Sequence, residues 1–403
     1  MRILVVSLEL VTAPFSGNGV LAAAQAGALA AAGHTVCVLS AAPAGAARGE
    51  PPALCRAVEV GVPREAWGRL DASGPWREFA SGAADAATTI AAAPPDIVLA
   101  VDWTGWLAAA ALKAARPDAF AQVPVLFAAF RVHSRTDGAA AVMDAETGAM
   151  RGAAAAAALC AADAGALAAL APGRAAVAVL IPPLRAAIRD LPPPDAPQRT
   201  LLTCCVRLSP EKEPHRFVAL VEAAAATGAF AGLGIRPALV GAGRDPYAAS
   251  LRARLLDAWP GALVIPDFLD PPALAARVLD RTLLNVHPSL EDAFGMTVVE
   301  AGARGAPTAL HGVCGGGEGV AGAPPRSSIG AAALLRPGAG EAFAVDLSAS
   351  PAAAAAAIAS LLSDRARLAS AGAAAAARVR AHDERAHGAE LGRLLEACVG
   401  SGV

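Results

Sequence analysis

Short apolar runs alternate with alanine-rich stretches along nearly the whole chain, and this alternation restricts the possible folds more than any other feature. The first example is RILVVS at residues 2–7, followed by SGNG at 16–19 and by a helical pattern from about residue 20 to 32. Gly33 then favours a helix C-terminus, and HTVCVLS at 34–40 is typical of a second strand. Strand, glycine-rich loop, helix and strand in this order predict a parallel sheet covered by helices on both faces.

The alternation continues toward the C-terminus and is interrupted once, by DLPPPDAPQR at residues 190–199, which favours an extended hinge. Further strands are predicted at 96–101, 123–130, 175–181, 200–206, 236–241, 262–266, 282–288 and 306–311. Further helices are predicted at 107–115, 144–159, 214–227, 246–258, 271–279, from about 297, and at 351–362, 364–380 and 382–398. The fold class is therefore α/β, with two Rossmann-like doubly wound domains facing a central cleft.

The domain boundaries follow from this pattern and from the length of the chain. At 403 residues the chain exceeds one ordinary hydrophobic core. We place an N-terminal domain at 1–189, the linker at 190–199 and a second domain at 200–380. Residues 381–403 are predicted to form a helix, for which packing back on the N-terminal domain is one possible arrangement.

Composition excludes several classes of protein. The formal net charge is −2, so the basic surface that nucleic-acid binding requires is missing. Alanine accounts for much of the 55% hydrophobic content, and the alanine runs at 153–158, 352–357 and 373–377 are shorter than the roughly 18 to 20 residues of a membrane span. The apolar N-terminus is interrupted by Glu9, and no cleavage site of small residues follows. We expect a soluble, cytoplasmic protein with no integral membrane segment.

The seven cysteines favour reduced thiols. Their number is odd, and no CxxC spacing occurs, so neither a disulfide framework nor a zinc site is indicated. No other cluster of metal-ligating residue types is evident in the sequence. We expect activity that needs neither a metal ion nor a bound cofactor.

Acidic residues concentrate in HPSLEDAFGMTVVEAGARGAP, residues 287–307, where a strand leads into a helix. Gly295 allows the backbone to approach a ligand closely, and the N–H groups around Met296 and Thr297 are suited to phosphate or sugar oxygens. Asp292 and Glu300 are eight positions apart, a spacing that addresses two ends of one ligand, and carboxylates bind sugar or ribose hydroxyls well. The residues alone leave an alternative open, in which the aspartate is an N-cap and the glutamate a solvated helix residue.

Two cations follow the strand at 200–206. Arg207 and Lys212 lie five positions apart in RLSPEK, on the loop between a strand and a helix, and this spacing suits a diphosphate clamp. A surface ion pair between the arginine and Glu211 is the alternative reading.

The glycine-rich loop at 16–19 is weaker evidence. It is not a complete G-x-G-x-x-G, and Ser40 and Ala41 stand where a dinucleotide-binding protein would have an acidic residue after the second strand. A nicotinamide-dependent dehydrogenase built from similar sheets is therefore disfavoured.

Taken together, these segments resemble the retaining, nucleotide-sugar-dependent glycosyltransferases of family 4, which have the GT-B fold. The order is a first-strand glycine loop, then R-L-x-x-E-K, then P-S-x-x-[DE]-x-F-G-x-x-x-x-E-A-x-A-x-G-x-P, then GGG-E. The resemblance covers nearly the whole chain and is sharpest at 287–307. It implies a retaining hexosyltransferase whose N-terminal domain takes the acceptor and whose C-terminal domain takes the donor.

The resemblance also implies roles for individual residues. Arg207 and Lys212 would hold the nucleotide diphosphate, Asp292 would contact hydroxyls of the donor sugar, and Glu300 would bind the ribose. Backbone N–H groups of Phe294, Gly295, Met296 and Thr297 would contact sugar and phosphates, and Gly17 and Gly19 would line the site from the other domain. The nucleotide diphosphate sugar is a co-substrate, the acceptor is an unidentified sugar, glycan or small molecule, and donor base and sugar stay open.

The sequence departs from the family pattern at a few positions. Val206 replaces the glycine that often precedes the clamp arginine, and Val101 replaces the histidine of an H-D-W-like segment, which leaves Asp102 and Trp103. Phe130 stands near the place of a sugar-contacting histidine. Pro182-Pro183 replaces an Asn-Gly, and His133 is read as a surface residue. These departures keep a second hypothesis open, a GT-B relative of low or no activity that binds a nucleotide sugar or a glycan as a regulatory module.

Overall fold

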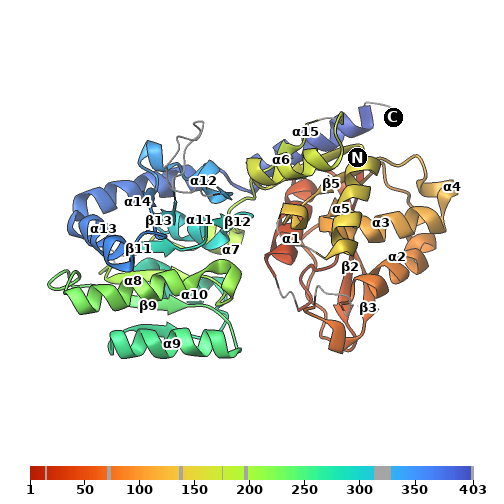
Figure 1. Cartoon of the computed structure of the whole chain (residues 1–403). Helices are drawn as coiled ribbons and strands as arrows, with labels where there is room; N and C mark the ends of the chain where they lie inside the picture. The colour runs from red at the N-terminus through yellow and green to blue at the C-terminus, as the bar shows by residue number, and fades with distance from the viewer. Residues whose placement is uncertain are drawn as a thin grey trace. The chain divides into compact units, whose positions relative to one another are not determined.

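The computed structural model describes residues 1–13, 16–69, 74–135, 139–174, 176–194, 198–312 and 328–400. The chain divides into two compact units, and Figure 1 labels most of their helices and several of their strands. Unit 1 comprises Met1–Pro183 together with Asp383–Val403, and unit 2 comprises Leu184–His382. Both termini therefore belong to unit 1.

Unit 1 is built on a parallel sheet. Within the described residues this sheet has seven strands in the order β3-β2-β1-β4-β5-β6-β7, and each neighbouring pair is parallel. The strands are β1 (Arg2–Ser7), β2 (Thr35–Pro43), β3 (Cys55–Val62), β4 (Ile97–Val101), β5 (Val125–Ala128), β6 (Ala155–Ala158) and β7 (Ala178–Val179). The helices are α1 (Gly17–Ala31), α2 (Trp76–Ala91), α3 (Asp102–Ala115), α4 (Pro117–Phe120), α5 (Ala140–Gly152), α6 (Ala161–Leu170) and α15 (Glu384–Gly400).

Helices cover both faces of the unit 1 sheet, because the side chains of β1 are apolar on both faces of that strand. Ile3 and Val5 pack in one buried cluster with residues of α1 and α15. Leu4 and Val6 point to the opposite face and pack in a second cluster with residues of α2 and α3. Successive side chains of a strand point to opposite faces, so a continuous apolar strand needs an apolar layer on each side.

The C-terminal helix α15 packs on α1 through small residues. A Cβ atom placed at Gly388 would lie 3.0 Å from Ala28, so this glycine permits the close approach of the two helices. Leu391 and Leu395 complete the apolar face of α15 and are fully buried.

One predicted helix was too long. The sequence indicated a helix over 144–159, but α5 ends at Gly152 and the alanine run continues as strand β6 between β5 and β7. Alanine has the highest intrinsic helix propensity, yet that preference amounts to only a few tenths of a kcal/mol per residue against most alternatives. Pairing on both edges and burial of Ala156, Ala157 and Ala158 override it.

Unit 2 repeats the architecture. Among the described residues its main sheet has six strands in the order β10-β9-β8-β11-β13-β15, and β12 pairs with β14 in a separate ribbon. The strands are β8 (Leu201–Cys205), β9 (Arg236–Val240), β10 (Leu263–Ile265), β11 (Thr282–His287), β12 (Glu291–Asp292), β13 (Thr308–His311), β14 (Ser328–Ile329) and β15 (Phe343–Val345). The helices are α7 (Ala186–Arg189), α8 (Pro214–Thr227), α9 (Pro246–Ala258), α10 (Pro271–Arg277), α11 (Met296–Ala303), α12 (Ala331–Leu334), α13 (Pro351–Ser363) and α14 (Arg365–Arg380).

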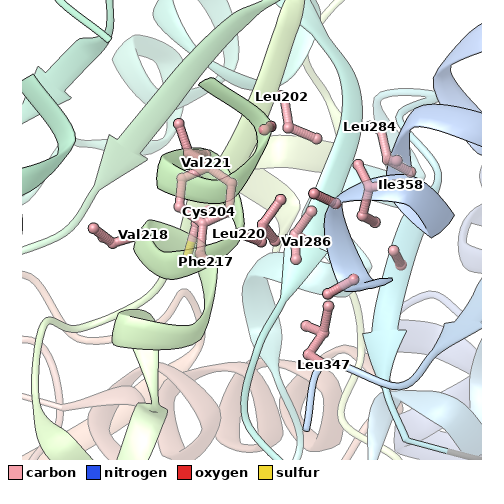
Figure 2. Close-up of a cluster of buried hydrophobic side chains, with 14 of the residues drawn as sticks. Leu202, Cys204, Phe217, Val218, Leu220, Val221, Leu284, Val286, Leu347 and Ile358 are labelled. Carbon is pink, nitrogen blue, oxygen red and sulfur yellow. The ribbon is translucent and has the colours of Figure 1, made fainter. Parts of the chain in front are cut away.

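The largest core of unit 2 lies between the sheet and the helices α8 and α13. Figure 2 shows Phe217 and Val221 of α8 with Leu284 of β11 and Ile358 of α13, all fully buried. Few aromatic side chains take part, so leucine, valine and isoleucine supply most of the burial. This core holds β8 and β11 together, and the loops that leave their carboxyl ends carry the predicted site.

Two expectations from composition concern the chain as a whole. Within the described ranges, no helix is both long enough and apolar enough to cross a membrane. Six of the seven cysteines lie in these ranges, and all six are free thiols. Four of them, Cys160, Cys204, Cys205 and Cys398, are buried.

Candidate functional site

The predicted acidic segment forms the turn between β11 and helix α11 in unit 2. Gly295 has φ +87°, in the left-handed region that glycine enters without strain, and it is the N-cap of α11. The N–H groups of the first turn of a helix have no partner within the helix, so those of Met296 and Thr297 are suited to an anionic ligand. The Thr297 hydroxyl donates to the carbonyl of Cys205 at 2.8 Å and ties α11 to the end of β8.

Asp292 is at the centre of a group of three polar side chains. The Lys212 ammonium Nζ lies 2.9 Å from its Oδ2, and Nε2 of His287 lies 3.3 Å from the same oxygen. The lysine comes from the loop after β8, and the histidine is the last residue of β11. The paired strands β8 and β11 therefore bring together residues that are 75 or more positions apart.

This environment keeps Asp292 ionised. Burial alone would raise the pKa of the carboxyl group, but its contact with Nε2 of His287 and the positive charge of Lys212 outweigh burial and hold the pKa below its ordinary value. The ammonium of Lys212 has three N–H bonds, of which the aspartate takes one. The alternative in which Asp292 is the helix N-cap is wrong, because Gly295 occupies that position.

Glu300 is 1% exposed on α11, so the alternative of a solvated helix residue is also wrong. Arg185, just before α7, donates from Nε to Oε1 of this carboxylate at 2.6 Å, and its Nη2 contacts the same oxygen. Burial raises the pKa of Glu300, and the guanidinium charge opposes that rise. No sequence pattern pointed to Arg185, because it stands 115 positions away from Glu300.

Arg207 lies apart from these buried groups. Its Nη2 donates to Glu211 at 2.8 Å, and the side chain is 57% exposed. This contact is the surface ion pair that the sequence left open as an alternative. Such pairs contribute little to stability, on the order of 1 kcal/mol or less, so the arginine can exchange its partner at small cost.

Two side chains missed in the sequence fasten the loops of the site to each other. Ser289 donates its hydroxyl to the carbonyl of Glu291 at 2.6 Å and to that of Glu211 at 3.2 Å. Glu213 has φ +49° and accepts the N–H of Leu290 at 2.9 Å. The segment around Lys212 is thereby held against the segment that carries Asp292. The one sequence signal for Ser289 and Glu213 is that both are polar residues close to the segments predicted to form the site.

Gly241, after β9, allows the loop after β9 to approach the loop after β8 closely. A Cβ at this position would lie 1.8 Å from the carbonyl oxygen of Val206, and its φ is +156°. The glycine-rich segment 315–319, which completes the sequence pattern, lies outside the described residues. No three His, Cys, Asp or Glu side chains gather as metal ligands in the part of the chain that the structure describes.

In unit 1, the predicted glycine loop is the first turn of α1. Gly17 opens the helix, and Gly19 is buried within that turn, whereas the sequence predicted helix only from about residue 20. A Cβ at Gly17 would lie 2.9 Å from the ring of Phe130, so the glycine makes room for the aromatic side chain. Buried Glu9 accepts hydrogen bonds from the N–H and hydroxyl of Ser16 at this helix start.

A second polar group lies where β1 and β4 are neighbours in the unit 1 sheet. Asp102 follows β4 with φ +61° and is 7% exposed. Burial raises its pKa to about 7, and the charges of Glu146 and Glu9 act in the same direction. His133, read from the sequence as a surface residue, is half-buried with its ring edge-on to Trp103, and burial lowers its pKa to about 4. The order in which strands are added to the sheet reverses between β1 and β4, and such switch points are where ligands bind in doubly wound sheets.

Residues 16–183 match a family model described as the glycosyl transferase 4-like domain. This part of unit 1 is therefore similar in sequence to that domain. The two-unit fold is GT-B, as comparison with solved structures shows, so the resemblance stated from the sequence is confirmed for the fold. No curated protein matches the chain in sequence.

Three solved structures illustrate the GT-B match, which extends over nearly all of each chain. HepE from Anabaena in complex with UDP and glucose is 16% identical, with a TM-score of 0.68 over 98% of this chain and 100% of that one. Sucrose-phosphate synthase from Thermosynechococcus elongatus is 17% identical, with a TM-score of 0.72 over 100% of both. The trehalose-6-phosphate protein from E. coli bound with UDP-2-fluoro glucose is 14% identical, with a TM-score of 0.71 over 98% and 99%.

Proposed function

We propose that the protein transfers a hexosyl unit from a nucleotide diphosphate sugar to a hydroxyl acceptor, with retention at the anomeric carbon. The observation that carries the proposal is the pairing of Lys212 with Asp292 beside the N-terminus of α11, with buried Glu300 one turn further along that helix. Cation, carboxylates and helix N–H groups are the chemistry that a diphosphate, a sugar and a ribose require. The UDP and glucose bound to HepE support a uridine nucleotide as the first donor to test.

The reaction needs stabilisation of the departing phosphate more than it needs a strong base. The bond between the anomeric carbon and the diphosphate oxygen breaks, and the acceptor oxygen bonds to that carbon on the same face. The acceptor proton passes to the released phosphate oxygen, so atoms and charges balance. Lys212 and Arg207 offset the negative charge that grows on the diphosphate, and Asp292 orients the donor through its hydroxyls.

Unit 1 would supply the acceptor side in this proposal. Asp102 and Glu9 are buried carboxyl groups at the switch point of its sheet, with Gly17 and Gly19 in the adjacent first turn of α1. A sugar or other hydroxyl-bearing acceptor matches these groups. The acceptor itself has to be found by a screen of compounds.

The test is release of UDP from UDP-glucose by the purified protein, compared between wild type and Lys212→Ala. Lys212 is one of only two lysines in the chain, so Lys113→Ala on α3 of unit 1 is a matched control. We expect Lys212→Ala to lose at least about tenfold in rate, because charge-assisted contacts to a phosphate are each worth about 1.5–3 kcal/mol. Lys113→Ala should retain the wild-type rate.

Equal release by wild type and Lys212→Ala would refute the assigned diphosphate contact. Calorimetric binding of UDP-glucose with no turnover against any acceptor would instead support the regulatory-module alternative. If no nucleotide sugar raises the melting temperature of the protein, both the transferase and the regulatory-module hypotheses are contradicted, because a ligand that binds the folded state raises that temperature by mass action.

A further inference from the structure

The carboxylate of Glu300 has two unequal oxygens. Arg185 approaches Oε1 with both Nε and Nη2, and the Nε–Oε1 distance is 2.6 Å. Oε2 is buried and has no hydrogen-bond partner among the residues that the structure describes. A buried carboxylate oxygen without a donor is costly, on the order of 1–3 kcal/mol or more. The missing donor therefore indicates a group that arrives with a ligand.

Arg185 is held where it is by the fold. It is the N-cap residue of α7, and α7 contacts both α10 and α11. Its side chain is 17% exposed, and both of its contacting nitrogens address the same oxygen of Glu300. The guanidinium thus fixes one oxygen of the carboxylate and leaves the other without a partner.

We propose that Arg185 is a positioning residue that holds Oε1 of Glu300 and so leaves Oε2 to accept a hydrogen bond from the ribose hydroxyls of the donor nucleotide. This inference rests on the proposed function, since it assumes that Glu300 binds the ribose. It adds which atom of the glutamate receives the sugar and which side chain keeps that atom available.

The surroundings of Glu300 make Arg185 decisive for its charge. A second titratable group that interacts with it is the thiol of Cys205 on β8, whose own pKa burial raises to about 12, so this thiol is neutral. From α14, the side that packs against α11 presents Ala375 and Val379 at Gly302, and these are apolar. Burial already raises the pKa of Glu300, and the guanidinium is the charge that opposes this. Without it the carboxyl would take up a proton closer to neutral pH.

The experiment measures binding of UDP and of 2′,3′-dideoxy-UDP by calorimetry between pH 5.5 and 8.5. The variants are Arg185→Gln, which removes the charge, and Arg185→Lys, which keeps it. Arg189→Gln is the matched control, because Arg189 is on the same short helix and pairs with exposed Asp190 at 2.7 Å. The wild type should bind UDP more tightly than the dideoxy nucleotide at every pH.

For Arg185→Gln we expect at least about a tenfold loss of UDP affinity at pH 6, as for a lost charge-assisted hydrogen bond. The loss should shrink as the pH rises, because the unpaired carboxyl of Glu300 then ionises again. Binding of 2′,3′-dideoxy-UDP should be unchanged, since it has no ribose hydroxyl to offer. Arg185→Lys should show the flat pH profile of the wild type, and Arg189→Gln should equal the wild type throughout.

Other results overturn the inference in distinguishable ways. Equal losses for UDP and the dideoxy nucleotide, or a loss that does not vary with pH, mean that Arg185 only supports the local structure. Unchanged UDP binding by Arg185→Gln means that Glu300 needs no such partner. If the wild type itself does not distinguish the two nucleotides, the ribose role of Glu300 in the proposed function fails, and the inference fails with it.

Discussion

The contact between Lys212 and Asp292 makes a stability prediction that needs no ligand. Lys212→Met keeps the apolar stem of the side chain and removes the charge, which leaves Asp292 with His287 as its partner. Breaking a fully buried ion pair costs about 3–5 kcal/mol, and an exposed pair is worth less than about 1 kcal/mol. These side chains are 23% and 12% exposed, so we expect Lys212→Met to lower the free energy of unfolding of unit 2 by about 1–3 kcal/mol.

The double variant Lys212→Met with Asp292→Asn isolates the interaction. It should be more stable than the sum of the two single losses predicts, by about 1–2 kcal/mol, because neither charge is then buried alone. The folded pKa of Asp292 is depressed, so this coupling is fully present at pH 7, begins to weaken as the pH falls past the unfolded value of about 3.9, and is lost as the pH falls through the folded pKa. Urea denaturation at pH 7 and at pH 3 measures both quantities. If the loss of stability in the double variant at pH 7 equals the sum of the two single losses to within about 0.5 kcal/mol, the reasoning is refuted.

Three further predictions concern positions around the two candidate sites. Gly295→Ala forces a side chain into the left-handed region at φ +87° and should lower the free energy of unfolding by about 1–2 kcal/mol, measured by urea denaturation; an unchanged midpoint would contradict the role of this glycine as the N-cap. Thr297→Val removes the 2.8 Å hydrogen bond to the Cys205 carbonyl and should cost about 1 kcal/mol, whereas Thr227→Val, at an exposed hydroxyl on α8, should cost less in the same assay. The folded pKa of Asp102 is raised to about 7, so its contribution to the free energy of unfolding is full below pH 4 and is lost as the pH rises through 7. Asp102→Asn should remove this pH-dependent loss of stability. Identical pH profiles of unfolding for variant and wild type would argue against a buried neutral acid.

The sequence predicted the elements of unit 2 well, because there apolar runs and turn signals agree. Helices α8 and α9 begin and end at the predicted residues 214–227 and 246–258, each with proline as its first residue. Proline suits the first turn, where its missing N–H costs nothing. In unit 1 the prediction failed at β6, an alanine run that is extended because it pairs with the strands on both sides. The prediction also did not include β3 or α2.

The candidate site was predictable where it is local in sequence. Asp292, Gly295 and Glu300 share one strand-to-helix junction, and their spacing suggested a ligand site while leaving capping and solvation open as the alternative. The partners that tune them were not predictable, because Arg185 and Lys212 approach through tertiary packing from 115 and 80 positions away. The same holds for Phe130, whose contact with Gly17 joins segments more than a hundred residues apart. Single-sequence patterns contain no information on such pairings.

The most direct measurement is a crystal structure of the protein soaked with UDP-glucose. We predict phosphate oxygens within about 3 Å of the Lys212 ammonium, the first N–H groups of α11 directed at the same ligand, and the ribose hydroxyls on Oε2 of Glu300. Electron density for the nucleotide at a place that touches none of Lys212, Asp292 and Glu300 would contradict it.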